Sequence, residues 1–142
     1  LSGLNEMAFS GPTEDRIAIR ELYDTYADAS ARASLETFLS CWTDDGQWNT
    51  HLFSRAGKAE LHEQWETLWT GFDKVAFLGS VLSIEIDGDE AAVRSLAHEI
   101  VALKGGGVFK LAGLYHDRVV RRGGRWLFQK RDYETLVEEL PG

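Results

Sequence analysis

The spacing of apolar residues changes along this chain from a helical period to a period of two. Between Thr13 and Phe72, apolar side chains recur three and four positions apart, which is typical of amphipathic helices. From Val75 to Tyr133, apolar and polar side chains alternate, which is typical of strands with one buried face. Helices followed by a run of strands predict an α+β domain and not a series of βαβ units.

The first part of the chain is predicted to hold three helices and one short strand. Thr13 is a plausible N-cap, because acidic residues follow it where the helix dipole favours them. The expected elements are a helix from Thr13 to Ser30, a short helix capped by Ser34 and stopped by Asp44-Asp45-Gly46, a strand over 47–53 and a helix over 57–72.

The second part is predicted to form four long strands, over 75–87, 91–103, 108–121 and 125–133. Leu82, Ile84 and Ile86 are expected on one face of the first of these strands. Long antiparallel strands twist and curl, and helices laid on the curled face can leave a conical cavity. We therefore expect about three helices packed on a curved, mainly antiparallel sheet, an arrangement that permits a conical cavity.

Length and composition limit the classes of protein that this chain can represent. The 142 residues fit one domain, which is expected over 13–142. Residues 1–12 are expected to form a flexible tail, in which Met7 is the natural start and 1–6 are an added extension. A net charge of -8 argues against nucleic acid and membrane surfaces as partners, and no apolar run of about 18 residues predicts a membrane helix. Cys41 is the single cysteine, so no internal disulfide is possible and a cytoplasmic location is expected.

Four segments in order resemble the SnoaL-like branch of the nuclear transport factor 2-like superfamily, over about residues 13–135. They are FLSCWTDDGQW, the helix start GKAEL, FLGSVLSIEIDGDEAAVRS and GLYHDRVVRRGGRWLFQKR. The resemblance implies a cone-shaped fold, an internal pocket and a homodimer or homotrimer. It also implies relatives that are cofactor-free lyases and isomerases, such as polyketide cyclases, scytalone dehydratase and hexachlorocyclohexane dehydrochlorinase, beside many members that are not enzymes.

In the dehydratase and dehydrochlorinase members, a His abstracts a proton and an Asp orients it. By register with this sequence, the Asp position corresponds to Ala31 and the His position to Ala76, and neither alanine can move a proton. The resemblance also places an anion-stabilising Arg at Arg131. The alternative that we favour is that Arg131 is structural and pairs with a carboxylate such as Glu99, because a buried unpaired guanidinium is costly.

The four histidines show no metal-ligand spacing, so no metal is expected. His51 follows the segment that carries Trp48, and it is the best remaining candidate to carry a proton near a pocket mouth. His98 is interpreted as a residue of the sheet or of an oligomer surface. In the alternating segment around His116, the resemblance favours an inward Tyr115. Asp28 is expected on a solvated helix face.

The aromatic residues carry the stronger functional signal. Trp42 and Trp126 are interpreted as core residues. Candidate substrate-binding residues come from separate elements that this fold would bring together: Tyr26, Trp48, Phe53, Trp65, Trp69, Tyr115 and Tyr133.

The sequence thus predicts a protein that binds a small, mostly apolar, cyclic molecule in its pocket. If it is an enzyme, it is a cofactor-free lyase or isomerase that uses Arg131 and His51. The alternative is a non-catalytic ligand-binding or oligomerisation module, which Ala31 and Ala76 favour.

Overall fold

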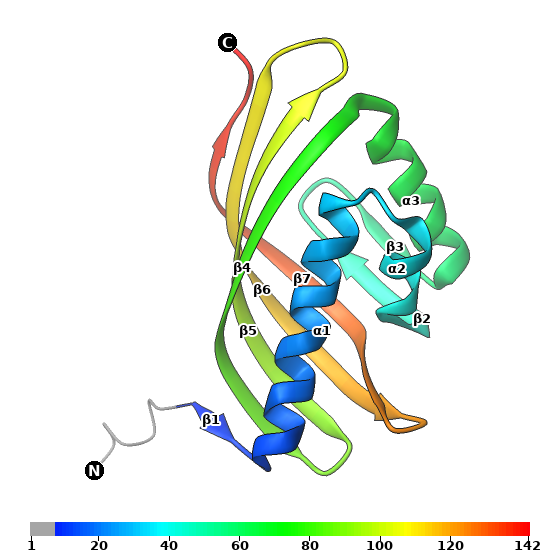
Figure 1. The fold of residues 1–142 in the computed structure, drawn as a ribbon, viewed down its shortest axis with the longest axis vertical. Helices are drawn as coiled ribbons and strands as arrows, with labels where there is room; N and C mark the ends of the chain where they lie inside the picture. The colour runs from blue at the N-terminus through cyan, green and yellow to red at the C-terminus, as the bar shows by residue number, and fades with distance from the viewer. Residues whose placement is uncertain (1–7) are drawn as a thin grey trace.

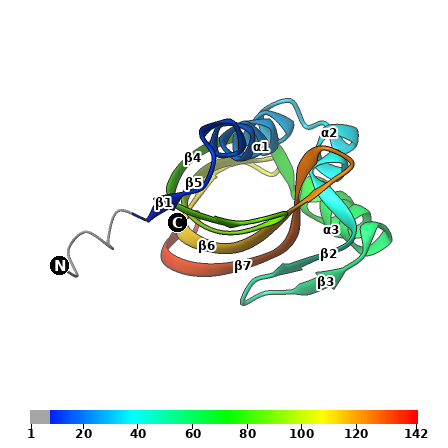
Figure 2. The same ribbon diagram turned by 90° about the horizontal axis from the view of Figure 1, so that it is seen from below.

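A computed structural model describes residues 8–142 as three helices on a strongly curved sheet. Helix α1 (Thr13–Ala31) lies within the concave side of the sheet, and α2 (Leu35–Ser40) and α3 (Lys58–Gly71) follow beside it (Figure 1). The view from below shows the strands curling around α1, with α2 and α3 at the open side of the curve (Figure 2). The predicted α+β cone is confirmed.

Within the part of the chain that the structure describes, the sheet has seven strands in the order β1-β4-β5-β6-β7-β2-β3, and its two edge strands do not pair with each other. Strands β4 to β7 form an antiparallel meander, whereas β1 pairs with β4 and β2 pairs with β7 in parallel. The strand bounds are β1 (Phe9–Ser10), β2 (Trp42–Asn49), β3 (Ser54–Ala56), β4 (Phe72–Asp87), β5 (Glu90–Leu103), β6 (Val108–Arg122) and β7 (Arg125–Glu139).

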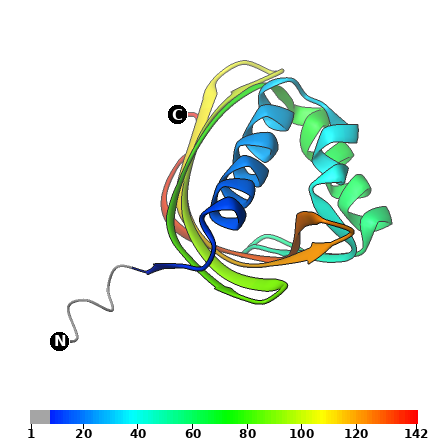
Figure 3. The ribbon, with the colours of Figure 1, turned by 60° about the horizontal axis from the view of Figure 1, so that its bottom comes forward.

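The core lies between α1 and the concave face of the sheet (Figure 3). On α1, Ile19 is buried in the same cluster as Ile84 of β4, and Tyr26 is buried with its ring centroid 5.7 Å from that of Phe77, as expected for an apolar helix stripe. Trp42 and Trp126 are also buried, which confirms their interpretation as core residues. The helices thereby close one side of the cone and position the aromatic residues over the sheet.

Part of the expected N-terminal tail belongs to the sheet. Phe9 and Ser10 form strand β1 and pair with Ile84 and Glu85 of β4, and the Ile84 amide donates to the Ala8 carbonyl. This pairing satisfies backbone groups at the edge of β4 that would otherwise be open. The expectation for residues 1–7 lies outside the described residues.

The strand after α2 begins earlier than the sequence predicts. Helix α2 ends at Ser40, and the turn-like residues 44–46 lie inside β2 instead of stopping a helix. Pairing with β7 shifts between Trp42 and Gln47, so a bulge accommodates these residues. Thr43 donates a hydrogen bond to Asp45 within the bulge.

Two details of the long strands also differ from expectation. A bulge between Val81 and Ser83 takes Leu82 out of the face that it was predicted to share with Ile84, and Leu82 is 38% exposed. Strand β7 continues to Glu139 because it stays paired with β6, where Glu139 lies opposite Lys110.

Among residues 8–142, no helix is both long enough and apolar enough to cross a membrane.

Candidate active site in an aromatic cavity

A cavity of about 280 Å³ lies between the concave sheet, the C-terminal half of α1, helices α2 and α3, and the segment 50–53. Its lining is mainly aromatic, and a single carboxylate, Glu99, projects into it among the described residues. The seven aromatic residues predicted from the sequence all line this cavity: Tyr26, Trp48, Phe53, Trp65, Trp69, Tyr115 and Tyr133. Their role in binding a substrate stays a prediction.

Local structure explains how the tryptophans reach the cavity. Trp65 and Trp69 lie one turn apart on α3, so both face the same side, and their ring centroids are 5.5 Å apart. Trp65 also stacks against Phe38 of α2, with centroids 4.6 Å apart. From β2, the Trp48 indole donates a hydrogen bond to the Tyr115 hydroxyl at 3.1 Å. The cavity wall is therefore apolar, while the buried polar atom of Trp48 is satisfied.

Glu99 is an ionisable residue that lines the cavity and was not predicted there from the sequence. It lies on β5, opposite Phe77 of β4 and Leu111 of β6. Burial raises the pKa of Glu99 to about 7, although the positive charge of Arg131 lowers it. The signal in the sequence is the period of two, which places Glu99 on the same face of β5 as the apolar residues Ala97 and Val101; the structure shows that this face is the buried one.

The Tyr133 hydroxyl is a second polar group at the cavity. It is buried and has no hydrogen-bond partner within the described part of the chain. Burial raises the pKa of Tyr133, and the negative charge of Glu99 raises it further, so the hydroxyl keeps its proton. Glu99 and Tyr133 together offer one proton acceptor and one proton donor to a bound molecule.

Gly113 makes room for Tyr133. A Cβ atom at Gly113 would collide with the ring and hydroxyl of Tyr133 and with the Glu134 carbonyl. Pairing between β6 and β7 shifts at this point, between Ala112 and Gly113. The absence of a side chain at Gly113 thus sets the position of Tyr133.

We expect Gly113→Ala to lower the free energy of unfolding by about 2 kcal/mol, because overpacking here must move backbone as well as the Tyr133 ring. Urea denaturation measures this change. Gly71→Ala is the matched control, since no atom lies within 4 Å of a Cβ built at Gly71. Equal stability of the two variants would contradict this account of Gly113.

Arg131 forms a buried ion pair with Asp117. The Nε and Nη2 atoms of Arg131 each lie 3.0 Å from one oxygen of the Asp117 carboxylate, and both side chains are at most 1% exposed. Tyr23 donates a further hydrogen bond to Asp117 at 2.5 Å. The favoured interpretation of Arg131 as a paired structural residue agrees with this geometry, but the partner is Asp117 and not Glu99.

Aromatic rings separate the Arg131 guanidinium from the aromatic cavity. Its central carbon lies 3.7 Å from the ring centroid of Tyr115 and 4.6 Å from that of Tyr26. Burial alone would lower the pKa of Arg131, but Asp117 and the neighbouring tyrosines raise it, so the guanidinium stays charged. In this arrangement Arg131 orients the tyrosines that line the cavity, and its direct role in chemistry stays a prediction.

His51 lies at the mouth of the aromatic cavity. Its imidazole is about half exposed, shares a hydrogen bond with Thr135 at 3.1 Å and lies 3.7 Å from the Glu138 carboxylate. The expectation that His51 is near a pocket mouth agrees with this position. Its role as a proton carrier stays a prediction.

The two alanines that were taken to replace the family's acid–base pair face away from the cavity. Ala31 is exposed at the end of α1, and Ala76 is exposed on the outer face of β4. The neighbouring residues that line the cavity are Ser30 on α1, and Val75 and Phe77 on β4. A shift of one residue reverses the face at Ala76 on strand β4 and turns the helix by about 100° at Ala31 on α1, so these alanines carry no argument about chemistry inside the cone.

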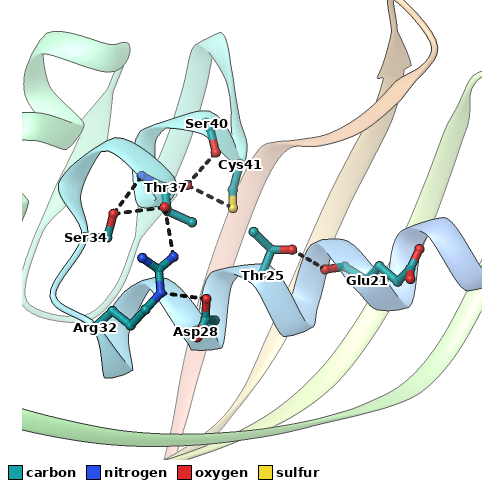
Figure 4. A network of polar contacts seen from close by, with 8 residues as sticks. All are labelled: Glu21, Thr25, Asp28, Arg32, Ser34, Thr37, Ser40 and Cys41. Atoms are coloured by element: carbon teal, nitrogen blue, oxygen red, sulfur yellow. Dashed lines mark hydrogen bonds and ion pairs between the residues drawn. The ribbon is translucent and has the colours of Figure 1, made fainter.

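Two other sequence interpretations, those of Asp28 and Tyr115, agree with the structure. Asp28 forms an exposed ion pair with Arg32, which also reaches Thr37 of α2 (Figure 4). Tyr115 points inward, whereas His116 is exposed and bonds Glu134. Among residues 8–142, no group of three or more His, Cys, Asp or Glu side chains is placed to hold a metal ion.

A curved sheet that closes over a helix and encloses an aromatic cavity defines the class of cone-shaped α+β proteins to which this chain belongs. The sequence profile of the SnoaL-like domain matches residues 12–132. The chain is therefore a member of the SnoaL-like family, within the nuclear transport factor 2-like superfamily. A comparison with curated protein sequences finds no match.

Solved structures with the same fold carry several different activities in their names. A candidate scytalone dehydratase of Novosphingobium aromaticivorans has a TM-score of 0.83 at 22% identity, over 88% of this chain and 86% of the other. A candidate aromatic ring hydroxylase of the same species has a TM-score of 0.83 at 23% identity, over 90% and 93%. A hexachlorocyclohexane dehydrochlorinase of Novosphingobium barchaimii has a TM-score of 0.79 at 19% identity, over 89% of each chain. These likenesses establish the fold alone.

Proposed function

We propose that this protein binds a small, mostly apolar, cyclic molecule in the aromatic cavity and acts on it as a cofactor-free lyase or isomerase. The observation that carries the proposal is that Glu99 lines an aromatic cavity together with the Tyr133 hydroxyl, which has no hydrogen-bond partner among the described residues. Burial there raises the pKa of Glu99 to about 7. Groups that titrate near neutral pH and lie in a cleft are suited to general acid–base catalysis. A volume of about 280 Å³ suits a molecule of one or two rings.

The proposed chemistry starts with Glu99 as general base. Its carboxylate takes a proton from a carbon next to a carbonyl group, and the electron pair of that C–H bond moves toward the carbonyl oxygen. The Tyr133 hydroxyl donates a hydrogen bond to this oxygen as negative charge develops on it. If the substrate carries a C=C bond next to the deprotonated carbon, Glu99 then returns the proton at the far carbon of that bond, which is isomerisation. If the carbon next to the deprotonated one carries a leaving group, the electron pair forms a C=C bond and the group departs with the electrons of its own bond, which is elimination.

The residues proposed from the sequence have supporting roles in this scheme. Arg131, neutralised by Asp117, holds the rings of Tyr115 and Tyr26 in place. His51 at the mouth exchanges protons between the cavity and solvent. The dehydratase and dehydrochlorinase names of two structural neighbours support a lyase-type reaction.

Naphthalene is expected to bind in the cavity and to quench tryptophan fluorescence, because three of the five tryptophans line it. A fluorescence titration with naphthalene measures the affinity. Leu68→Trp, which inserts a larger side chain at the cavity wall, should weaken binding at least tenfold. Leu136→Trp on the exposed part of β7 is the matched control and should leave the affinity unchanged. Quenching that is equal in both variants would contradict binding in the cavity.

A non-catalytic ligand-binding module is the second candidate function. The absence of ionisable groups at the cavity-lining positions Ser30, Val75 and Phe77 favours it. The two candidates share the ligand site and differ in whether Glu99 moves a proton.

The homodimer or homotrimer expected from the resemblance stays a prediction. The outer face of the sheet exposes Leu78, Leu96 and Ile100 beside His98, which is a surface suited to contact between copies.

A further inference from the structure

A second cavity, of about 200 Å³, lies between α1 and strands β4 and β5. We call it the Ser95 pocket, and its lining includes Ser95, Arg131, Gly79, Tyr26 and Phe77. Its wall is more polar than that of the aromatic cavity. Nothing in the function proposed above uses it.

Two buried hydrogen-bond donors at the Ser95 pocket lack partners within residues 8–142. They are the Ser95 hydroxyl and the Nη1 atom of Arg131, and these residues are 2% and 1% exposed. The other two nitrogens of the Arg131 guanidinium are bound to Asp117, so Nη1 is the donor left over. A buried donor without a partner is costly, and a pocket that holds two of them is suited to an oxygen acceptor.

The Ser95 pocket and the aromatic cavity share a wall. Tyr26 and Phe77 line both, and their ring centroids are 5.7 Å apart. Tyr26 is fixed within the core, at 3% exposure, whereas Phe77 is only partly buried. Phe77 is therefore the less tightly packed half of the wall.

Gly79 leaves space on the far side of Phe77. It lies two residues along β4 and lines the Ser95 pocket. A Cβ atom at Gly79 would lie 3.5 Å from the Phe77 ring and 3.8 Å from the Leu96 carbonyl, which are ordinary contacts. A larger side chain at Gly79 would thus fill the pocket without a clash at its first atom.

We propose that the Ser95 pocket is the second compartment of the ligand site and binds an oxygen-bearing substituent of a molecule whose ring occupies the aromatic cavity. The Phe77 side chain lies between the two compartments and controls access of the substituent to the Ser95 pocket. The oxygen accepts hydrogen bonds from Ser95 and from Nη1 of Arg131. This inference rests on the proposed function, because it requires the ring to bind in the aromatic cavity. It assigns the substrate class as cyclic ketones, acids or alcohols with a short side arm.

The test compares two probes of the same shape, 2-acetylnaphthalene and 2-ethylnaphthalene, by calorimetric titration of the full chain. An aromatic cavity alone favours the ethyl compound, because a carbonyl loses its hydration on burial. We expect the acetyl compound to bind about tenfold more tightly, since hydrogen bonds to a buried hydroxyl and a charged guanidinium outweigh that loss.

Three variants and one control variant show which residues cause the preference for the carbonyl. Ser95→Ala and Gly79→Val should each reduce it at least fivefold, and Ser83→Ala, another buried serine that lines neither cavity, should leave it unchanged. Phe77→Leu should increase it, because a smaller side chain at this position opens the passage. Circular dichroism confirms that each variant is folded.

The outcomes separate the two proposals. If both probes bind with equal affinity, the Ser95 pocket is not a subsite and the proposed function stands. The same conclusion follows if the acetyl compound binds more tightly but this preference is unchanged in Ser95→Ala and Gly79→Val and is lost in Tyr133→Phe. If neither probe binds, the proposed function fails and this inference fails with it.

Discussion

Replacing Glu99 by Gln is expected to raise the free energy of unfolding by about 2 kcal/mol at pH 8 and to change it little at pH 4. In the folded protein, burial raises the pKa of Glu99 from 4.5 to about 7, so the folded state keeps a proton that the unfolded state releases. Stability is therefore highest below the unfolded pKa and falls as the pH rises from about 4.5 to about 7. A shift of this size corresponds to about 3 kcal/mol, which solvent reaching the carboxyl through the cavity reduces.

Urea denaturation of the wild-type protein and the Glu99→Gln variant at several pH values measures this difference. Glu85→Gln, which replaces an exposed carboxylate on β4, is the control and should show no such trend. A difference between Glu99→Gln and the wild type that is the same at pH 4 and pH 8 would show that Glu99 titrates normally. The assignment of Glu99 as a base poised near neutral pH would then be wrong.

Asp117→Asn is expected to lower the free energy of unfolding by about 3–5 kcal/mol, which is the largest loss of stability predicted for any variant of this protein. The substitution keeps the shape of the side chain but leaves the buried charge of Arg131 without its counter-ion. For a chain of this length, such a loss lowers the melting temperature by roughly 10–15 °C. Differential scanning calorimetry measures the change.

Two further variants show that the ion pair is responsible. Tyr23→Phe removes one hydrogen bond to Asp117 and should cost about 1 kcal/mol. Asp132→Asn, at a side chain that is 46% exposed, should cost less than 1 kcal/mol. If Asp117→Asn is no more destabilised than Asp132→Asn, the buried pair is not what holds Arg131 in place.

The sequence predicts the fold well because the fold depends on periodicity. The helical stripe of α1 and the alternation of the long strands follow directly from which residues are apolar. The errors arise where hydrogen bonding interrupts the period. Residues 44–46 resemble a turn in sequence but lie inside β2, where a bulge accommodates them. The bulge beside Leu82 turns that side chain outward.

The candidate site was predicted in part. Convergence of the aromatic residues followed from the fold, since large apolar side chains on inward faces must meet. The register of the resemblance puts Ala31 and Ala76 at positions that face away from the cavity. An error of one position reverses the face of a strand, which applies to Ala76, and turns a helix by about 100°, which applies to Ala31. The partner of Arg131 and the orphaned donor of Ser95 depend on pairing across β5, β6 and β7, which no local pattern reveals.

The central claim is that Glu99 moves a proton on a ring bound in the aromatic cavity. The most direct measurement is deuterium incorporation from D₂O into the carbon next to the carbonyl of 2-tetralone, followed by NMR. We expect the wild-type protein to accelerate this exchange, with a rate that rises through about pH 7, and the Glu99→Gln variant to bind 2-tetralone equally well without accelerating it. Binding of 2-tetralone to the wild-type protein with exchange no faster than in buffer would contradict the claim and leave a ligand-binding module.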